Sequence, residues 1–197
     1  MTWWWWWWLG CPKPVVADPT AVPAAVPAAA VPVPAADVPV ALAPRLFDAA
    51  GLRDGFVLGT KLRLAVQAAG APPVEQRWEV IEHTASGCTI RSEDVDPSTG
   101  APLGPPEVGT STWAELESHA SFPADHTEVA DDTITVPAGT FTTRRYTVRG
   151  DDGTTKVVHF AVDLPGPPVS MVVTGDGTAE GGVLFSMVLL ERTRPSP

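Results

Sequence analysis

The segment Ile134–Val148, with the sequence ITVPAGTFTTRRYTV, decides how the rest of the chain can be arranged. Its two halves are rich in β-branched and aromatic residues, which favour strands. Pro137 cannot donate a ladder hydrogen bond, so the first strand must be an edge strand or end at Val136. Gly139 supplies the backbone freedom for a turn or a bulge. The segment therefore predicts two consecutive strands, and it contains no evident nucleophile, general base or set of metal ligands.

Three further strands are predicted before this segment. In residues 61–67, 74–80 and 88–91, apolar side chains alternate with charged or polar ones, as in strands with one buried face. Gly and Pro at 70–73 and the small residues at 85–87 mark short turns between them. Strands joined by such short turns pair with their neighbours, so we expect an antiparallel meander.

One short helix is predicted after a long loop at residues 94–109. Thr112 and Glu115 have the spacing of a capping box, which satisfies backbone N–H groups at a helix start. Trp113 and Leu116 then fall on one face of the helix. A helix this short is marginal alone, so we expect these two side chains to hold it against the sheet.

The C-terminal part continues the β pattern. Residues 150–153 predict a hairpin turn into a strand at 155–162, and 169–173 is another alternating strand. The last strand, 183–190, is apolar on both faces and is expected in the centre of the sheet. The predicted fold class is mainly β (α+β): a curved antiparallel sheet of about seven or eight strands, partly closed over one short helix.

Residues 1–11 look like an atypical export signal. Trp3–Trp8 is an unbroken tryptophan run, and Leu9-Gly10-Cys11 resembles the end of a bacterial lipobox, whose Cys is lipidated after cleavage. The apolar run is short for a signal peptide, and no Lys or Arg precedes it. Three interpretations stay open: a lipid on Cys11, a secretory signal without lipid, or a tryptophan run without biological meaning at a misassigned start.

Residues 12–45 form a linker rich in Pro, Ala and Val. Prolines at such regular spacing block helices and central strands and favour an extended, polyproline-like chain. About thirty such residues reach on the order of 100 Å, enough to hold a domain away from a membrane. A low-complexity tail without function is the alternative. The foldable part is predicted to be a single β-rich domain at residues 46–194.

Charge and cysteine content restrict the partners. The net charge of −10 disfavours nucleic acid, whose phosphates would be repelled. The chain has no apolar stretch of about 20 residues, so no membrane-spanning helix is predicted. Its two cysteines, Cys11 and Cys88, could form a disulfide in an oxidising compartment. Alternatively, Cys88 is a small buried residue in a strand.

Candidate catalytic and metal-binding residues form no convincing set. The four histidines His83, His119, His126 and His159 lack the spacing of zinc ligands, and no G-x-S-x-G motif is present. Glu93, Asp94 and Asp96 crowd one predicted loop but lack the spacing of a calcium-binding EF-hand. We therefore predict no catalytic residue, no metal site and no cofactor.

The motifs of residues 113–168 resemble a group of uncharacterised, mostly secreted or lipoprotein-like bacterial proteins. The resemblance is carried by the segments Trp113–Leu116 and His119–Pro123, by VPAGTF at 136–141 and by DLPGPP at 163–168. That group is similar to the lipoprotein-carrier-like (half-barrel) folds, in which a curved antiparallel sheet wraps a helical element and can enclose an apolar cavity. The resemblance implies a fold and transfers no catalytic residue.

Together these features predict a non-catalytic binding or structural domain, either a cell-envelope lipoprotein of the periplasm or outer membrane or a secreted protein. The predicted partners are a membrane, through a lipid anchor on Cys11, and an apolar small molecule. The pocket candidates for that molecule are Trp78, Trp113, Leu116, Phe122, Phe141 and Phe160, with plain core packing as the alternative. The alternative functions are a hydrolase or metal-dependent enzyme, built from His119, His126 and the acidic loop, and an exported adhesion or assembly module.

Overall fold

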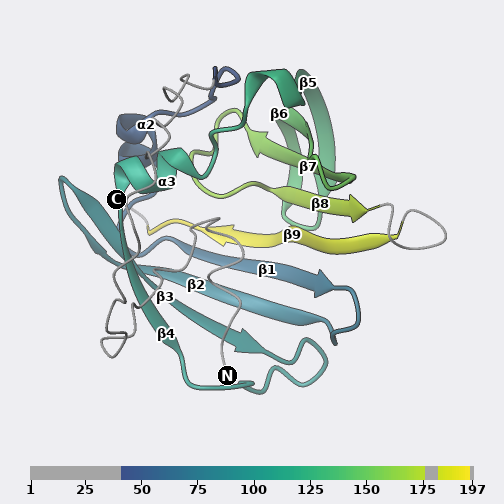
Figure 1. The fold of residues 1–197 in the computed structure, drawn as a ribbon. Coiled ribbons are helices and arrows are strands. Elements are labelled where there is room, and N and C mark those ends of the chain that lie inside the picture. Colours follow the sequence, from purple (N-terminus) through teal and green to yellow (C-terminus); the bar gives the residue numbers. More distant parts are fainter. Residues whose placement is uncertain (1–40, 176–181, 196–197) are drawn as a thin grey trace, which may run out of the picture. The chain divides into compact units, whose positions relative to one another are not determined.

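The computed structural model describes residues 41–175 and 182–195, which form one antiparallel sheet of nine strands with short helices (Figure 1). The strands are β1 (Lys61–Ala68), β2 (Val74–His83), β3 (Gly87–Val95), β4 (Glu107–Thr112), β5 (Thr127–Val136), β6 (Gly139–Arg149), β7 (Thr154–Ala161), β8 (Ser170–Gly175) and β9 (Val183–Thr193). The helices are α2 (Ala49–Gly55), α3 (Trp113–Ser118) and the 3-10 helix η1 (Ala124–His126).

The strand order is β4-β3-β2-β1-β9-β8-β7-β6-β5, so two meanders meet at β9. The last strand pairs with β1 on one side and with β8 on the other, as its two apolar faces predicted. The meander of β1, β2 and β3 is confirmed, and β5 is an edge strand that ends at Val136, so both alternatives given for it hold. The mainly β fold class is correct, with nine strands instead of seven or eight because β4 was expected to be loop.

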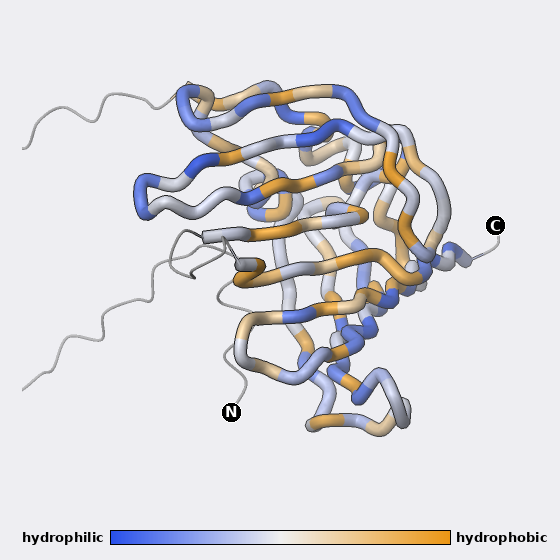
Figure 2. Tube along the Cα trace, turned by 90° about the vertical axis from the view of Figure 1, so that its right-hand side faces the viewer, coloured by the Kyte–Doolittle hydropathy of each residue, from blue (hydrophilic) through white to orange (hydrophobic). Residues whose placement is uncertain are grey.

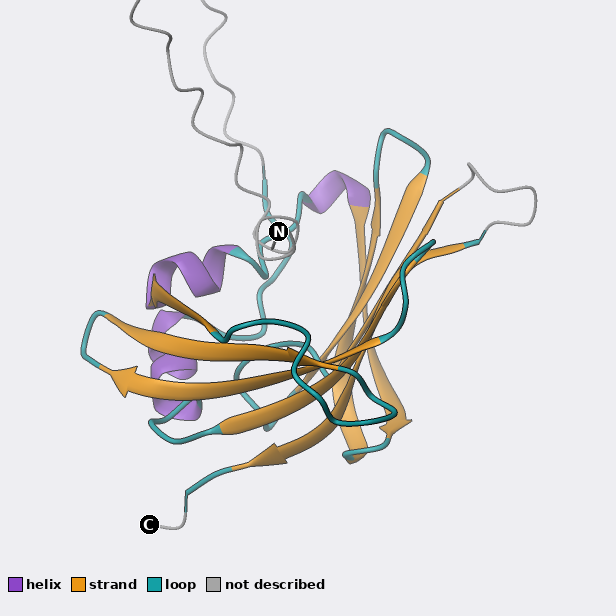
Figure 3. Cartoon of the chain, turned by 90° about the horizontal axis from the view of Figure 1, so that it is seen from below, coloured by secondary structure: helices purple, strands orange, loops and turns teal. Residues whose placement is uncertain are grey.

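The sheet is bent, and α2 and α3 lie against one of its faces (Figure 3). We call this the inner face and the opposite one the outer face. Apolar and polar residues alternate along several strands (Figure 2), because successive side chains point to opposite faces. The inner face carries the core, whose buried members include Leu62, Leu64, Tyr146, Met187 and Leu189. The outer face carries Lys61, Arg63, Glu79 and Glu191, whereas Arg192 of β9 lies opposite Leu62 on the inner face.

Residues 41–44, which were predicted to belong to the linker, pack against the β-rich domain. Ala43 is buried, and its N–H donates to the carbonyl oxygen of Phe122 at 2.9 Å. The hydroxyl of Tyr146 donates to the carbonyl oxygen of Pro44 at 2.8 Å. The segment at 41–44 thus joins the inner face, because these contacts satisfy polar groups that would otherwise be buried without partners.

Helix α2 was not predicted, and Arg192 attaches it to the central strand. The carboxylate of Asp48 caps the helix start by accepting from the N–H of Gly51 at 2.7 Å. At the other end, Arg192 Nη2 of β9 donates to the carbonyl oxygen of Gly55 at 2.8 Å. The same guanidinium donates through Nη1 to Pro165 O at 3.0 Å, within the DLPGPP segment. That motif therefore forms a connection that packs around a half-buried arginine.

Helix α3 has the predicted capping box. The N–H of Glu115 donates to Thr112 Oγ1 at 3.2 Å, and Glu115 Oε2 accepts from the N–H of Thr112 at 2.7 Å. Replacing Thr112 by Ala is expected to lower the free energy of unfolding by about 1 kcal/mol, the usual value of a lost N-cap. Urea unfolding followed by circular dichroism measures it. Ser118→Ala, at the last residue of the helix, is the control and should change stability less; an equal loss would contradict the role of the cap.

Candidate binding surface

The six predicted pocket residues do not line one shared wall. Phe122 and Phe160 both contact Tyr146, with ring centroids 5.3 and 5.8 Å from it. Trp113 packs instead on His83, and the centroids of the two rings are 5.1 Å apart. The indole Nε1 of Trp113 donates to the carbonyl oxygen of Thr84 at 3.1 Å. Phe122, Phe160 and Trp113 are all buried. These aromatic side chains therefore form two separate parts of the core.

The other three pocket candidates lie elsewhere. Leu116 is half-buried on α3, and Trp78 is half-buried on β2 opposite Leu62 of β1. Phe141 of β6 is five residues before Tyr146 on a strand whose pairing with β5 has no register shift. Since side chains alternate along a strand, Phe141 lies on the outer face and Phe160 on the inner one.

The histidines considered for catalysis have different surroundings. His126 Nδ1 lies 3.7 Å from an Asp151 carboxylate oxygen, whereas His159 Nε2 lies 3.5 Å from Asp132. His119 follows α3, where burial lowers the pKa of its imidazole. In residues 41–175 and 182–195, no three His, Cys, Asp or Glu side chains come together in a way that could hold a metal ion.

The predicted acidic loop is largely strand. Glu93 and Asp94 belong to β3, where consecutive residues point to opposite faces of the sheet. Burial raises the pKa of the Asp94 carboxyl group. Asp96 follows the strand and accepts from the N–H and hydroxyl of Ser98, at 2.7 and 2.6 Å, which lowers the pKa of its carboxyl group. The three carboxylates are thus directed to separate places by the alternation of the strand.

The outer face of β9, β1, β2 and β3 carries a shallow trough with a volume of about 280 Å³. Cross-strand partners share a face, so one wall is formed by Thr193, Lys61, Glu79 and Arg91, which are paired in that order across the four strands. The second wall is formed in the same way by Glu191, Arg63, Arg77 and Glu93. The walls are about 7 Å apart, the distance between alternate residues of a strand.

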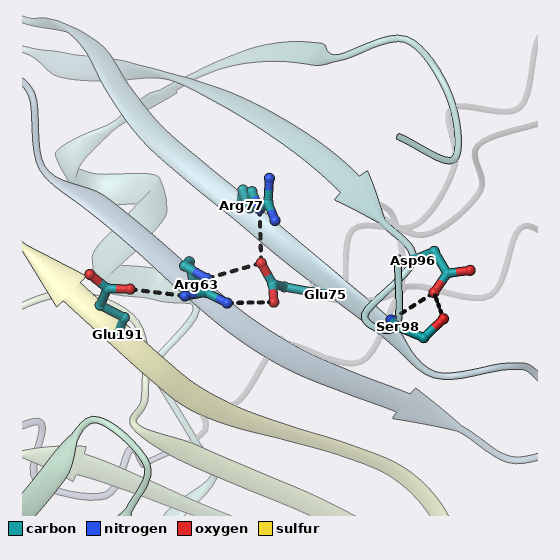
Figure 4. A network of polar contacts seen from close by, with 6 residues as sticks. All are labelled: Arg63, Glu75, Arg77, Asp96, Ser98 and Glu191. Carbon is teal, nitrogen blue, oxygen red and sulfur yellow. Dashed lines mark hydrogen bonds and ion pairs between the residues drawn. The ribbon is translucent and has the colours of Figure 1, made fainter. Parts of the chain in front are cut away.

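A buried carboxylate holds two of the trough's cations in place (Figure 4). Glu75 Oε1 and Oε2 accept from Arg63 Nε and Nη2 at 2.9 and 2.8 Å, a bidentate pair. Glu75 Oε1 also accepts from Arg77 Nε at 2.8 Å. Arg63 Nη1 reaches Glu191 Oε2 at 3.0 Å. Arg63 and Arg77 lie directly opposite each other, so Glu75 offsets the repulsion of a like-charge cross-strand pair.

Glu75 is 5% exposed although it lies on the outer face, because the two arginine side chains cover it. Its hydrogen bonds with Arg63, and then those with Arg77, lower the pKa of its carboxyl group from 4.5 to about 2, against the opposing effect of burial. On the first wall, Glu79 pairs with Arg91 and lies 3.4 Å from Lys61 Nζ. The trough therefore presents cations and anions in a fixed pattern at neutral pH.

This trough was not predicted, although Lys61, Arg63, Arg77, Glu79 and Arg91 were recognised as the polar sides of three strands. Glu93 was assigned to a loop, and Glu191 and Thr193 were not singled out. The visible signal was the alternation of charge at 61–63, 75–79 and 91–93, which also fits an ordinary solvated face. Only the cross-strand pairing, and above all the pairing of β1 with β9, brings Glu191 to Arg63.

Cys88 is buried in β3, as the strand interpretation predicted, and burial raises the pKa of its thiol to about 11. Because the thiolate is the reactive species, we expect Cys88 to resist iodoacetamide at pH 8 until the chain unfolds. Mass spectrometry of a Cys11→Ser chain with and without urea measures this. Rapid alkylation of the folded chain would contradict the buried position.

Cys11, the signal-like segment and most of the linker lie outside the described residues, and so does any Cys11–Cys88 disulfide. In the part of the chain that the structure describes, no helix is both long and apolar enough to cross a bilayer.

No family model matches the sequence, and no curated protein is detectably similar to it. Among solved structures, MucB has a similar fold, with a TM-score of 0.50 and 10% identity over 72% of this chain and 55% of MucB. The complex of Pseudomonas aeruginosa MucA and MucB gives a TM-score of 0.48 and 10% identity, over 68% of this chain and 50% of that one. The chain thus spans about half the length of the structures it resembles. At this identity the likeness concerns the fold alone, a β-rich architecture.

Proposed function

We propose that this chain is an exported, non-catalytic binding module of the cell envelope, and that its outer trough contacts a protein partner. The observation that carries the proposal is the fixed charge pattern of the trough, with Glu75 buried beneath Arg63 and Arg77. Charges that are already held in position lose less entropy on binding, and a mixed pattern selects a partner with the complementary one.

The partner is proposed to be a protein because the trough is shallow, charged and spread over four strands. Small apolar ligands prefer deep, mostly apolar cavities. Of the predicted pocket residues, Phe122, Phe160 and Trp113 belong to two packed clusters, Phe141 lies on the outer face, and Trp78 is among the residues that line the charged trough. The fold likeness to MucB, which has been solved in complex with MucA, agrees with a role in protein binding.

A pair of charge reversals tests the use of the trough. Arg77 and Arg91 are 42% and 53% exposed, and Glu75 keeps its bidentate pair with Arg63 when both are replaced by Glu. Because a carboxylate at position 77 would lie beside Glu75, circular dichroism must show that the variant is folded before its binding is compared. A protein partner should copurify with the wild-type chain from the native envelope. We expect the amount of this partner recovered with Arg77→Glu/Arg91→Glu to be at least ten-fold lower. The matched control is Arg149→Glu/Lys156→Glu, the same charge change on β6 and β7. Equal recovery of the partner by both variants would overturn the proposed role of the trough.

The location at the envelope is tested separately. We propose a lipid on Cys11 and a linker that lets the folded domain stand away from the membrane. Mass spectrometry of native protein should find an acylated Cys11 in the membrane fraction, and Cys11→Ser should move the chain to the soluble fraction. An unmodified Cys11 in soluble native protein would contradict the anchor without bearing on the trough.

A further inference from the structure

The two edges of the sheet are not equivalent. Edge strand β5 carries Glu128 and Asp131, whose side chains are 56% and 74% exposed, and acidic side chains on an edge discourage pairing with another strand. Edge strand β4 has the sequence EVGTST, and its charge is confined to Glu107 at the start. Val108, in the middle of this edge, is 62% exposed. Strand β4 is thus the edge without a charged barrier.

The backbone of β4 offers hydrogen-bonding groups on its free side. Trp113 N donates to Ser86 O across the β3–β4 pairing. Alternate residues of an antiparallel strand point their N–H and C=O to the same neighbour, so those of Gly109 and Ser111 point to β3. The N–H and C=O groups of Val108 and Thr110 point away from β3, to the free edge of the described sheet. The N–H of Thr112 points the same way and is taken by the Glu115 carboxylate at 2.7 Å.

We propose that two copies of this chain pair through β4, antiparallel, about a two-fold axis at Gly109. In this register Val108 of each copy lies opposite Thr110 of the other, and the outward N–H and C=O groups of both residues exchange four hydrogen bonds. Gly109 meets its own copy without side-chain crowding. The ladder ends at the next pair, because Pro106 has no N–H and that of Thr112 is occupied.

A second copy of β4 fits this edge because its own sequence is complementary to it in the two-fold register. In this register Glu107 of one chain lies opposite Ser111 of the other, so no like charges meet across the new pairing. The exposed Val108 gains a β-branched neighbour, which strand pairs favour. The remaining barrier is the general repulsion between two chains of net charge −10, which salt screens. Added salt should therefore strengthen the self-association.

A charge-swap experiment tests both the edge and the register. Interfaces well below 1,200 Å² are weak, so the full-length chain is followed by sedimentation up to about 1 mM. When all chains carry Val108→Lys, or all carry Thr110→Glu, the new charges of the two copies lie diagonally across the two-fold axis and repel each other. Each variant alone should therefore weaken association at least ten-fold. An equimolar mixture of V108K and T110E chains places opposite charges face to face and should recover association close to the wild-type value.

Thr133→Lys, on the other edge strand, matches the charge change of V108K and should associate as the wild type does. Circular dichroism confirms that each variant is folded. A wild-type chain that stays monomeric over the whole concentration range would overturn the proposal and leave the edge free for a foreign strand. A mixture that associates no better than its separate components would overturn it equally, as would an equal effect of T133K and V108K.

Discussion

Replacing Glu75 by Gln is expected to lower the free energy of unfolding by about 2 kcal/mol at pH 7. The variant keeps the size of the side chain but removes the charge that holds two arginines, Arg63 and Arg77, side by side. A pKa lowered from 4.5 to about 2 corresponds to about 3 kcal/mol at most. Exposure of the two guanidinium groups, at 45% and 42%, weakens the pairs through solvent screening, so we expect the smaller value.

The pH dependence has a definite sign. Because the carboxyl pKa of Glu75 is lower in the folded chain, its contribution is fully present above pH 5, where the unfolded chain is also ionised. The contribution is lost as the pH falls from about 5 to 2, and the wild type and Glu75→Gln should converge in stability over that window. Urea unfolding at several pH values, followed by circular dichroism, measures the difference.

Glu191→Gln is the matched control, since Glu191 is about half exposed and contacts the same Arg63 at the surface. It should change stability by less than about 0.5 kcal/mol. A wild type and an E75Q variant that differ by a constant amount between pH 7 and pH 2 would contradict the role assigned to the charge of Glu75.

Replacing Arg192 by Ala is expected to lower the free energy of unfolding by about 3 kcal/mol. The guanidinium donates to the carbonyl oxygens of Gly55, Leu164 and Pro165, which would lose a partner at about 1 kcal/mol each. It also lies 5.9 Å above the ring of Phe56. Burial, and then Arg194, lower its pKa to about 10, so the group remains charged at neutral pH.

Two variants separate the mechanism from a general loss of packing. Arg192→Lys keeps the charge and one ammonium donor group but lacks the planar, several-donor geometry of the guanidinium. It should recover less than half of the free energy of unfolding that Arg192→Ala loses. Arg194→Ala removes an exposed side chain whose Nη2 donates to Gly55 O at 2.7 Å, and should cost about 1 kcal/mol. Equal stability of Arg192→Ala and Arg194→Ala in urea unfolding would show that the Arg192 guanidinium does not hold α2 to β9.

The sequence predicted the elements whose patterns are local. Alternation with a period of two marked β1, β2 and the start of β3, and Thr112 with Glu115 marked the start of α3. The VPAG segment became the turn between β5 and β6, with Gly139 at a φ of +139°, which is a conformation that glycine tolerates. The apolar pattern of β9 was sufficient to predict its central position.

Elements whose stability depends on distant contacts escaped prediction. Helix α2 has seven residues, two of them glycine, and is held by Arg192 from a strand 137 residues later in the sequence. Strand β4 lies between a proline-rich loop and helix α3. It is an edge strand of the described sheet and is paired with β3. The trough required the same long-range information, because its walls exist only when four strands are in register. The family suggested by the VPAGTF and DLPGPP motifs remains a prediction, since no family model matches the chain.

Photo-crosslinking in living cells tests whether a protein partner binds at the trough. A photoreactive residue replaces Arg91, in the wall of the trough, or Lys156, which is exposed on β7, and both chains are irradiated in the native host. We expect a discrete protein adduct from position 91 and none from position 156. Strong adduct formation at position 156 with none at position 91 would contradict a partner bound at the trough.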